Sequence, residues 1–459
     1  MRQAYRLEAV VLHQIGVFDE LRIDFPPIQS PDRDATKAEI HLLTGPNGCG
    51  KSTLLYVLAE IFRPPWERGL VGRRFRNNTS GTDFKFAGYG GYYGVRSPDP
   101  SPPPFPNMRH SGPFGDYADY QNDPSQGRYF GCAANELQQY KSATANFQPA
   151  NSHSQSVFSF AAFAYSGQRT VYDVPLGAIQ QINNSPFEHA LSFDLTARAG
   201  VLLQWIANNR AQSALAKADG DLKAAAVYDL ALSRISNLIR DICDLDVEFR
   251  LDRSPLAVSV KVSGQTIHFD SLPDGLKSII SWVADLSLRL EAIPWKVETD
   301  VFSQPVILFL DEVDIHLHPK WQRRILPALQ KLLPNAQIFV STHSPFVVGS
   351  VEDAWVYRLP EPGQSGPAIV EAMPSGAGKS YRLILDEIFG VNEEFDVETE
   401  SLFDDFYAAK EQFIKSSGSP ESLLKPAQQL AERGEEAAAI VTRELRQIAR
   451  ITGREISLA

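Results

Sequence analysis

The sequence contains little cysteine. Only three of its 459 residues are cysteines, namely Cys49, Cys132 and Cys243. Three thiols cannot form a disulfide framework, and one of them lies inside a glycine-rich motif. So few cysteines are typical of a protein kept in a reducing compartment. The sequence therefore indicates the cytoplasm and excludes a secreted domain held together by disulfides.

Long apolar stretches and an excess of basic charge are absent too. No run of 18 uncharged apolar residues occurs, and the residues after Met1 lack the apolar segment of a signal peptide. We therefore expect neither export nor a membrane span. The 44 Lys and Arg residues against 55 Asp and Glu residues give a net charge of −11. This balance argues against a surface built throughout for nucleic acid, although a local basic groove is compatible with it.

A glycine-rich segment, residues 44–53, is the most informative part of the chain. It contains the pattern Gly-x-x-x-x-Gly-Lys-Ser between an apolar strand-like run at 40–43 and a helix-like run at 54–58. Glycines let successive backbone N–H groups face phosphates at a helix N-terminus. Lys51 would neutralise the β- and γ-phosphate oxygens, and Ser52 would hold Mg²⁺. We expect the whole loop to bind a nucleoside triphosphate: Gly45, Pro46, Asn47, Gly48, Cys49, Gly50, Lys51, Ser52 and Thr53.

A second motif supplies carboxylates. The apolar strand expected at 306–310 ends at Asp311 and Glu312. Asp311 would bind the metal through water, and Glu312 would polarise the attacking water. Acidic residues after an apolar strand are common, so this signal becomes specific only together with the phosphate loop.

The order of the expected elements predicts an α/β protein. Apolar strands alternating with helices are typical of a sheet covered on both faces. Strands at 7–12 and 21–25 would form an opening sheet with the strand before the phosphate loop. Further along we expect two helices within 195–245, with a break at 219–221, and then three short strands within 247–269. Helices at 274–290 and 320–333 would alternate with strands at 306–310 and 337–341. Residues 1–380 would form one domain, with a Gly/Pro-rich insertion at 64–156 and a helical subdomain at 190–245, and 381–459 a helical region.

Together these motifs resemble the ABC class of ATPases, in particular its SMC and RecF-like branch. Residues 311–319, Asp-Glu-Val-Asp-Ile-His-Leu-His-Pro, look like the segment of that branch whose later residues touch a partner subunit. The resemblance of 338–345 to the switch segment places His343 near the γ-phosphate. Residues 165–168, Tyr-Ser-Gly-Gln, sit where the family has its Gln-containing loop, and this makes Gln168 a candidate ligand of Mg²⁺ and water. Gly275 would lie in the signature segment, which closes over the nucleotide of a second subunit, although Pro273 stands where the family has serine.

The resemblance implies an ABC-type ATPase head with a mixed sheet, in which ATP and Mg²⁺ join two subunits. Glu312, His343 and Gln168 would be the catalytic residues. Ser52, Gln168 and Asp311 would hold the metal. The interval between Gln168 and Gly275 is too short for the long coiled coil of SMC proteins.

A compact head of this kind resembles the stand-alone ATPases of bacterial antiphage defence, such as those of Septu, PARIS and some retrons, which work with a separate nuclease or toxin. We therefore expect a homo-oligomer, at least an ATP-dependent dimer, and an effector protein encoded nearby. Two alternatives stay open. One is a RecF-like repair ATPase that binds duplex DNA, so nucleic acid remains a candidate partner. The other is an assembly unit with little turnover, which Pro273 favours and Glu312 disfavours.

His316 and His318 are spaced like a pair of metal ligands, but no third ligand lies nearby in the sequence. We therefore expect a structural or dimer-contact role for them. Residues 376–380, Gly-Ala-Gly-Lys-Ser, imitate a second phosphate loop. Met373 stands where its first glycine belongs, so we interpret this segment as a turn before a helix.

Overall fold

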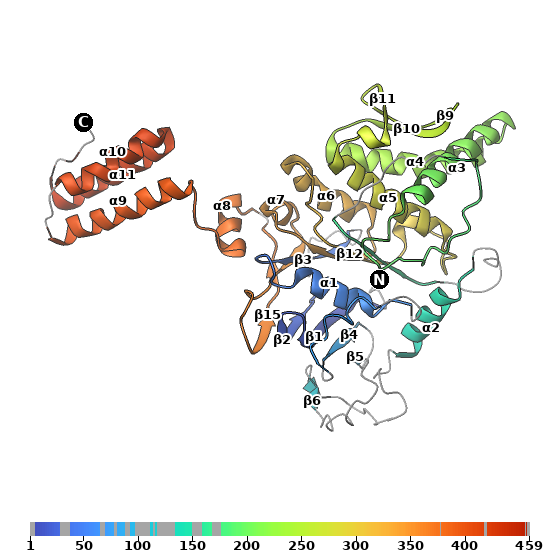
Figure 1. Cartoon of the computed structure of the whole chain (residues 1–459), viewed down its shortest axis with the longest axis horizontal. Coiled ribbons are helices and arrows are strands. Elements are labelled where there is room, and N and C mark those ends of the chain that lie inside the picture. The colour runs from blue at the N-terminus through green and yellow to red at the C-terminus, as the bar shows by residue number, and fades with distance from the viewer. Residues whose placement is uncertain are drawn as a thin grey trace. The chain divides into compact units, whose positions relative to one another are not determined.

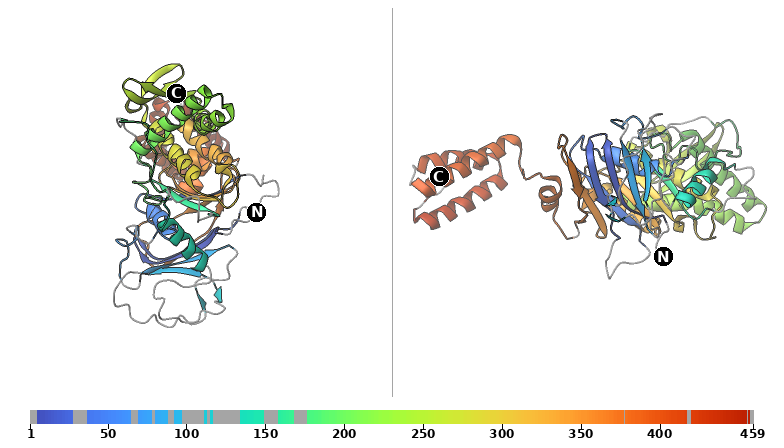
Figure 2. Two further views of the ribbon diagram at one scale, coloured as in Figure 1. Left: turned by 90° about the vertical axis from the view of Figure 1, so that its right-hand side faces the viewer. Right: turned by 90° about the horizontal axis from the view of Figure 1, so that it is seen from below.

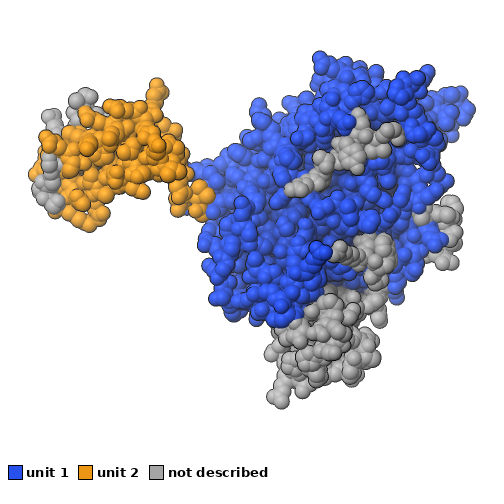
Figure 3. All heavy atoms as spheres, viewed as in Figure 1, with its two compact units in different colours: residues 1–389 blue, residues 390–459 orange. Residues whose placement is uncertain are grey.

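The computed structural model describes residues 5–27, 37–64, 69–77, 80–87, 92–96, 111–112, 115–116, 134–148, 158–167, 176–376, 378–416, 420–454 and 456. The chain divides into two compact units, Met1–Phe389 and Gly390–Ala459 (Figure 3). Over the described ranges, no helix is both long enough and apolar enough to cross a membrane.

A six-stranded sheet forms the centre of the first unit. Its five neighbouring strands from β14 to β8 are parallel, and β16 pairs antiparallel at one edge. The carboxyl ends of the parallel strands therefore meet along a single edge of the sheet. The strand order is β16 (Met373–Pro374), β14 (Ala354–Arg358), β3 (Glu39–Thr44), β13 (Ala336–Ser341), β12 (Val306–Leu310) and β8 (Ala161–Tyr165).

A second, mostly antiparallel sheet lies on the other side of helix α1 (Lys51–Glu60) (Figures 1 and 2). Phe62, just after α1, contacts Phe86 and Phe309 from the two sheets, with ring centroids 6.1 and 6.3 Å apart. The helix end is thus packed between both sheets. The strand order is β15 (Pro367–Val370), β2 (Phe18–Asp24), β1 (Leu7–Ile15), β4 (Gly81–Phe86) and β5 (Tyr92–Arg96).

The expectation that β1, β2 and β3 share one sheet is wrong. β1 and β2 form an antiparallel pair, whereas β3 lies between β13 and β14 in the parallel sheet. Five of the six residues of β3 are buried, as suits a strand covered on both faces. The region 64–156 also contains more regular structure than its composition indicates, because β4, β5 and α2 (Ala134–Ala145) lie in it together with the short pair β6 (Ser111–Gly112) and β7 (Gly115–Asp116).

The helical part of the first unit covers the far face of the six-stranded sheet (Figure 1). The expected break at 219–221 is confirmed, because Gly220 has φ 80° and the Asp221 side chain accepts a hydrogen bond from the Ala224 N–H. The elements are α3 (Ala199–Ala218), α4 (Leu222–Cys243), β9 (Val247–Arg253), β10 (Leu256–Val262), β11 (Gln265–His268), α5 (Asp274–Ala292), α6 (Pro319–Leu332), α7 (Pro345–Val348) and α8 (Tyr381–Ile384), which continues as a π-helical turn over Leu385–Phe389.

The second unit is a bundle of three helices, α9 (Val397–Ser416), α10 (Pro420–Arg433) and α11 (Glu435–Thr452). It has its own apolar core, to which Phe406, Leu430 and Val441 contribute. All three helices lie within 381–459, the region that the sequence predicts to be helical. Pro420 occupies the first position of α10, where a missing N–H costs no hydrogen bond.

Candidate functional site

The phosphate loop joins β3 to α1 with three glycines in the left-handed half of φ space. Gly45, Gly48 and Gly50 have φ values of 141°, 79° and 97°, which other residues rarely adopt. A Cβ atom on Gly50 would also collide with the ring of Phe18. The turn between β1 and β2 therefore presses directly against the loop, and only glycine fits at position 50.

Lys51 begins α1 and folds its side chain back over the loop. Its ammonium donates hydrogen bonds to the backbone carbonyls of Gly45 and Pro46, both at 2.9 Å. The first turn of α1 has no side-chain cap and no acidic residue of its own, so the positive end of the helix dipole is available to an anion at the loop. This arrangement fits a bound phosphate chain.

Three strand ends converge on Asp311, which is 5% exposed at the end of β12. The Ser52 hydroxyl donates a hydrogen bond of 3.1 Å to Asp311 Oδ1, and the Ser341 hydroxyl at the end of β13 donates to the same oxygen. The Asp311 N–H donates to the carbonyl of Tyr165 at the end of β8, at 2.9 Å. A hydroxyl beside a carboxylate suits Mg²⁺, which takes one or two protein oxygens and completes its shell with water and phosphate.

Glu312 follows in a strained backbone conformation, with φ 48°. Its N–H donates to the Ser341 hydroxyl at 2.7 Å, which holds the residue in this conformation. Partial burial raises the pKa of the Glu312 carboxyl, and the negative charges of Asp311 and Asp314 raise it further, while Lys51 opposes them. A raised pKa makes a carboxylate a stronger base, which suits proton transfer.

The segment leading to Gln168 lies against Glu312. A Cβ atom on Gly167 would stand 2.6 Å from the Glu312 carbonyl oxygen and 2.9 Å from a methyl carbon of Ile315. Only glycine permits this approach. Gln168 itself lies outside the described residues, so its role stays a prediction.

The switch segment follows β13 and begins beside the phosphate-loop strand, where the Thr342 N–H donates to the Leu43 carbonyl at 3.1 Å. His343 is exposed on one side. Its pKa is lowered, first by partial burial and then by the charge of Lys51, against the charges of Asp314 and Asp311. Neutral imidazole is therefore favoured at this position.

Gly275 lies in the first turn of α5 and packs against the loop that follows the carboxylates. A Cβ atom there would stand 2.6 Å from the His316 carbonyl oxygen and 3.2 Å from the ring of Trp321. The Pro273 carbonyl accepts hydrogen bonds from the N–H groups of Leu276 and Lys277, and Pro273 gives the helix no side-chain cap. Within one chain, the signature segment thus contacts the carboxylate loop. Its contact with a second subunit stays a prediction.

The two histidines of this loop differ in their surroundings. His316 has φ 61°, and His318 caps α6 by accepting a hydrogen bond of 3.2 Å from the Lys320 N–H. Across the described ranges, no group of three or more His, Cys, Asp or Glu residues could hold a metal ion. Capping is a structural role, one of the two expected for this pair.

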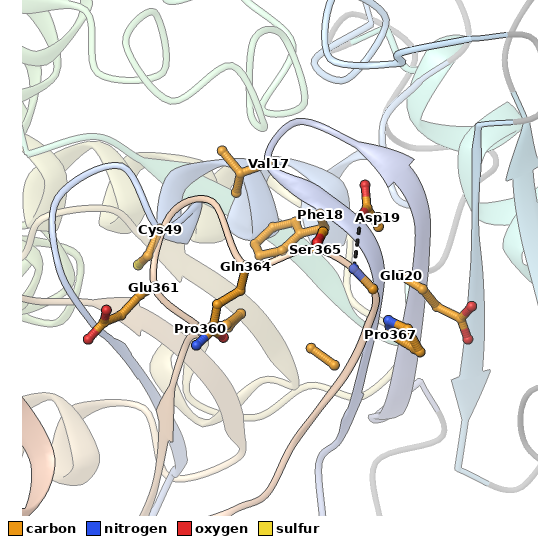
Figure 4. Close-up of a pocket in the computed structure, with 12 residues that line it drawn as sticks. Val17, Phe18, Asp19, Glu20, Cys49, Pro360, Glu361, Gln364, Ser365 and Pro367 are labelled. Atoms are coloured by element: carbon orange, nitrogen blue, oxygen red, sulfur yellow. Dashed lines mark hydrogen bonds between the residues drawn. The ribbon is translucent and has the colours of Figure 1, made fainter.

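Several residues at the site were missed by sequence reasoning, chiefly Ser341, Gly167, and Val17 and Phe18 where the turn after β1 enters β2. Ser341 is the last residue of an expected apolar strand, but the pairing of that strand with the carboxylate strand is visible only in the structure. The turn gives no such signal. It forms one wall of a pocket of about 60 Å³ beside the phosphate loop, with Cys49 and residues of the 360–368 segment as other walls (Figure 4).

The loop that forms another wall of this pocket is fastened to β2. The Gly366 N–H donates to the Asp19 carboxylate at 2.9 Å, shown as a dashed line in Figure 4, and Arg76 also contacts it. The hydrogen bond from Gly366, which has the largest effect, and the hydrogen bond from Arg76 lower the pKa of Asp19. The Asp19 carboxylate therefore holds the 360–368 segment against β2 beside the glycine loop, with Arg76 as its counter-charge.

Comparisons with known proteins agree with the motifs. The family described as AAA domain, putative AbiEii toxin, Type IV TA system matches residues 202–349, and the ABC transporter family matches residues 29–85. The Retron Vc95 probable ATPase of Vibrio cholerae serotype O1 biovar El Tor is 36% identical over 111 residues, which are 24% of this chain and 21% of the relative. Septu protein PtuA of Bacillus thuringiensis is 27% identical over 190 residues, or 37% of this chain and 47% of the relative.

The matches thus span about a fifth of the retron ATPase and about half of PtuA. Among solved structures, the SMC head domain from Thermotoga maritima aligns with a TM-score of 0.38 at 13% identity, covering 81% of this chain and all of that one. The phosphate loop, the carboxylate strand and these matches show that the chain is similar to the ABC transporter and AAA-domain families, and to a retron probable ATPase and Septu protein PtuA.

Proposed function

We propose that the protein binds and hydrolyses ATP with Mg²⁺, dimerises around ATP, and controls a separate nuclease or toxin in bacterial antiphage defence. The observation that carries the first part is the convergence of Ser52, Asp311 and Ser341 beside the glycine loop. It supports a metal-dependent phosphate site, because hydroxyl and carboxylate oxygens meet where a helix N-terminus faces the same space.

In this proposal the phosphate chain lies along the backbone of residues 45–53. Lys51 would exchange its carbonyl contacts for the β- and γ-phosphates, and Ser52 and Asp311 would hold Mg²⁺, which would neutralise phosphate charge. Glu312 accepts a proton from the attacking water, since its raised pKa makes it a stronger base than an ordinary glutamate. His343 and Gln168 orient the γ-phosphate and the water.

The second subunit would contribute Gly275 across the nucleotide. Release of phosphate then removes the contacts that hold two heads together, so hydrolysis acts as a timer for the assembled state. The effector is proposed because two relatives carry the names of a retron ATPase and a Septu protein. The helical unit 390–459 offers a separate folded surface to such a partner.

The experiment compares wild type, Lys51→Ala and Glu312→Gln in nucleotide binding, phosphate release and light-scattering mass with and without ATP and Mg²⁺. We expect Lys51→Ala to lose binding. Glu312→Gln should retain binding, stop turnover, and double its mass with ATP. Unchanged turnover in Glu312→Gln contradicts its catalytic role. A mass that ATP leaves unchanged contradicts ATP-driven dimerisation.

A pull-down of the ATP-locked Glu312→Gln protein with the products of neighbouring genes tests the effector. The proposal expects an ATP-dependent complex with one of them. The repair alternative instead expects ATP-dependent binding to duplex DNA that weakens steeply as salt rises. Salt-sensitive DNA binding without a protein partner would replace the defence role with the repair role.

A further inference from the structure

Gln322, in the first turns of α6, bridges the two segments that carry the proposed catalytic residues. Its carboxamide nitrogen donates to the backbone carbonyls of Asp314 at 3.2 Å and Leu317 at 2.9 Å. Its carboxamide oxygen accepts from the Ser344 hydroxyl at 2.7 Å. One side chain therefore ties the loop after Glu312 to the residue after His343.

The hydrogen bonds of this bridge are fully assigned. The amide NH₂ group has two hydrogens and meets two carbonyls, and the single hydroxyl hydrogen of Ser344 goes to the amide oxygen. The lone pairs of Ser344 accept the N–H groups of Phe346 and Val347, at 3.1 and 3.2 Å, and so cap α7. Turning the amide over would break all three bonds, so the geometry fixes its orientation.

The bridge continues on both sides. On one side, the Ile315 N–H donates to the Glu312 carbonyl at 3.1 Å, and Gly275 packs against the His316 carbonyl. On the other side, the Ser344 N–H donates to the Thr342 hydroxyl at 3.0 Å, which places His343 between two anchored residues. A continuous line of contacts therefore runs from the start of α5 through the carboxylate loop and Gln322 to His343.

We propose that Gln322 is a positioning residue that sets His343 relative to Glu312 and transmits displacements of the Gly275 segment to the switch segment. The inference deepens the proposed ATPase function and rests on it for its kinetic consequence. Gln322 touches no reacting atom. Its loss leaves the phosphate loop and the Ser341 contacts intact but removes the link between the loop after Glu312 and Ser344, because no other described side chain is bonded to both Asp314 and Ser344.

The test begins with Gln322→Leu, which keeps the size of the side chain and removes all three bonds. We expect ATP affinity within about twofold of wild type and kcat lowered by about ten- to hundredfold, the scale of a small misplacement of catalytic groups. The control is Gln330→Leu on the same helix. Gln330 donates to the carbonyls of Ala38 and Asp353, at 3.2 and 3.4 Å, and should leave kcat unchanged when corrected for folded protein.

A double-mutant cycle separates positioning from general destabilisation. If Gln322 acts through the switch segment, Gln322→Leu lowers kcat by less than about twofold in a His343→Ala background. If the kcat losses of Gln322→Leu and His343→Ala multiply in full in the double variant, the inference is overturned. Gln322→Glu gives a second variant of nearly the same shape, which keeps an acceptor for Ser344 but cannot donate to the two carbonyls. It should reproduce the kcat loss.

Amide hydrogen exchange supplies a readout that does not depend on turnover. Gln322→Leu should raise exchange in 313–318 and 342–348 together, and Gln330→Leu should not. If the wild-type protein shows no ATP turnover, the proposed ATPase function is refuted. The hydrogen-exchange result still tests the Gln322 bridge in that case. Normal turnover and unchanged exchange in both Gln322 variants would overturn the bridge and leave the ATPase proposal standing.

Discussion

Gly167 and Glu312 lie closer together than any other residue type at position 167 would allow. A Cβ atom there would stand 2.6 Å from the Glu312 carbonyl oxygen and 2.8 Å from the Glu312 Cβ. Gly167→Ala must therefore displace the proposed general base, and we expect kcat for ATP hydrolysis to fall at least about tenfold. Nucleotide binding, measured by fluorescence titration, should persist because the phosphate loop is not touched.

The matched control for this change is Gly177→Ala, since a Cβ atom at Gly177 meets no atom within 4 Å. Its turnover should equal that of wild type. Equal turnover in both variants would show that the approach of Gly167 to Glu312 has no bearing on hydrolysis.

Ser341 offers a second test, because its hydroxyl donates to Asp311 and accepts from the Glu312 N–H. Ser341→Ala leaves a buried carboxylate oxygen and an N–H with fewer partners, at a cost of about 1–3 kcal/mol. We expect the Mg²⁺ concentration for half-maximal turnover to rise about tenfold, measured by titration with EDTA-treated protein. Ser350→Ala, which removes one hydroxyl bonded only to the Val347 carbonyl, should leave this concentration unchanged.

The pH dependence of turnover tests the assignment of Glu312 as the base. Burial first, and then the charges of Asp311 and Asp314, raise its pKa. A base acts only when ionised, so turnover should fall as pH drops through this raised pKa. Asp314→Asn removes one negative charge, so the acid limb of kcat should move to lower pH. The limb should stay in place in Asp404→Asn, in the second unit, and an unmoved limb in Asp314→Asn would argue against Glu312 as the titrating group.

Glu39 provides a prediction about stability. Although burial raises its pKa, the hydrogen bond and charge of His41 and the contacts of Arg6 lower it from 4.5 to about 2. A group whose pKa is lowered by folding stabilises the protein above pH 4.5, and this stabilisation disappears as pH falls towards 2. Its size is about 3 kcal/mol at roughly 1.4 kcal/mol per pKa unit.

Urea denaturation of wild type and Glu39→Gln between pH 3 and 7 measures this contribution. The free energy of unfolding should differ most at neutral pH and converge in acid. If the difference in free energy of unfolding stays constant with pH, folding does not change the pKa of Glu39.

The local motifs of the site could be predicted from sequence, but their neighbours could not. The phosphate loop needs glycines at fixed spacing before a helix, and this requirement is visible in residues 45–52. Asp311 and Glu312 follow a strand whose apolar run is unambiguous. By contrast, Ser341 meets Asp311 only because β13 pairs with β12, and pairing between strands leaves no mark at either residue.

The sheets show the same limit. The sequence pattern locates β1, β2 and β3 but not their partners, because an antiparallel pair and a parallel pair can share similar apolar runs. β14 was not expected, although it lies beside β3 from Ala354 to Arg358. Its contact with β3 joins segments about three hundred residues apart, and such long-range pairing is decided by the whole core rather than by local preference.

β3 has paired strands on both sides, β13 and β14, and the Leu359 N–H fixes its last residue by donating to the Thr44 carbonyl at 2.9 Å. Because an interior strand of this kind is bonded along both edges, we expect it to be among the last parts of the first unit to open. If ATP binds at the phosphate loop as proposed, nucleotide exchange would involve the surrounding loops rather than β3. Bound ATP would then stabilise the first unit against unfolding, because only the folded chain holds the loop in place.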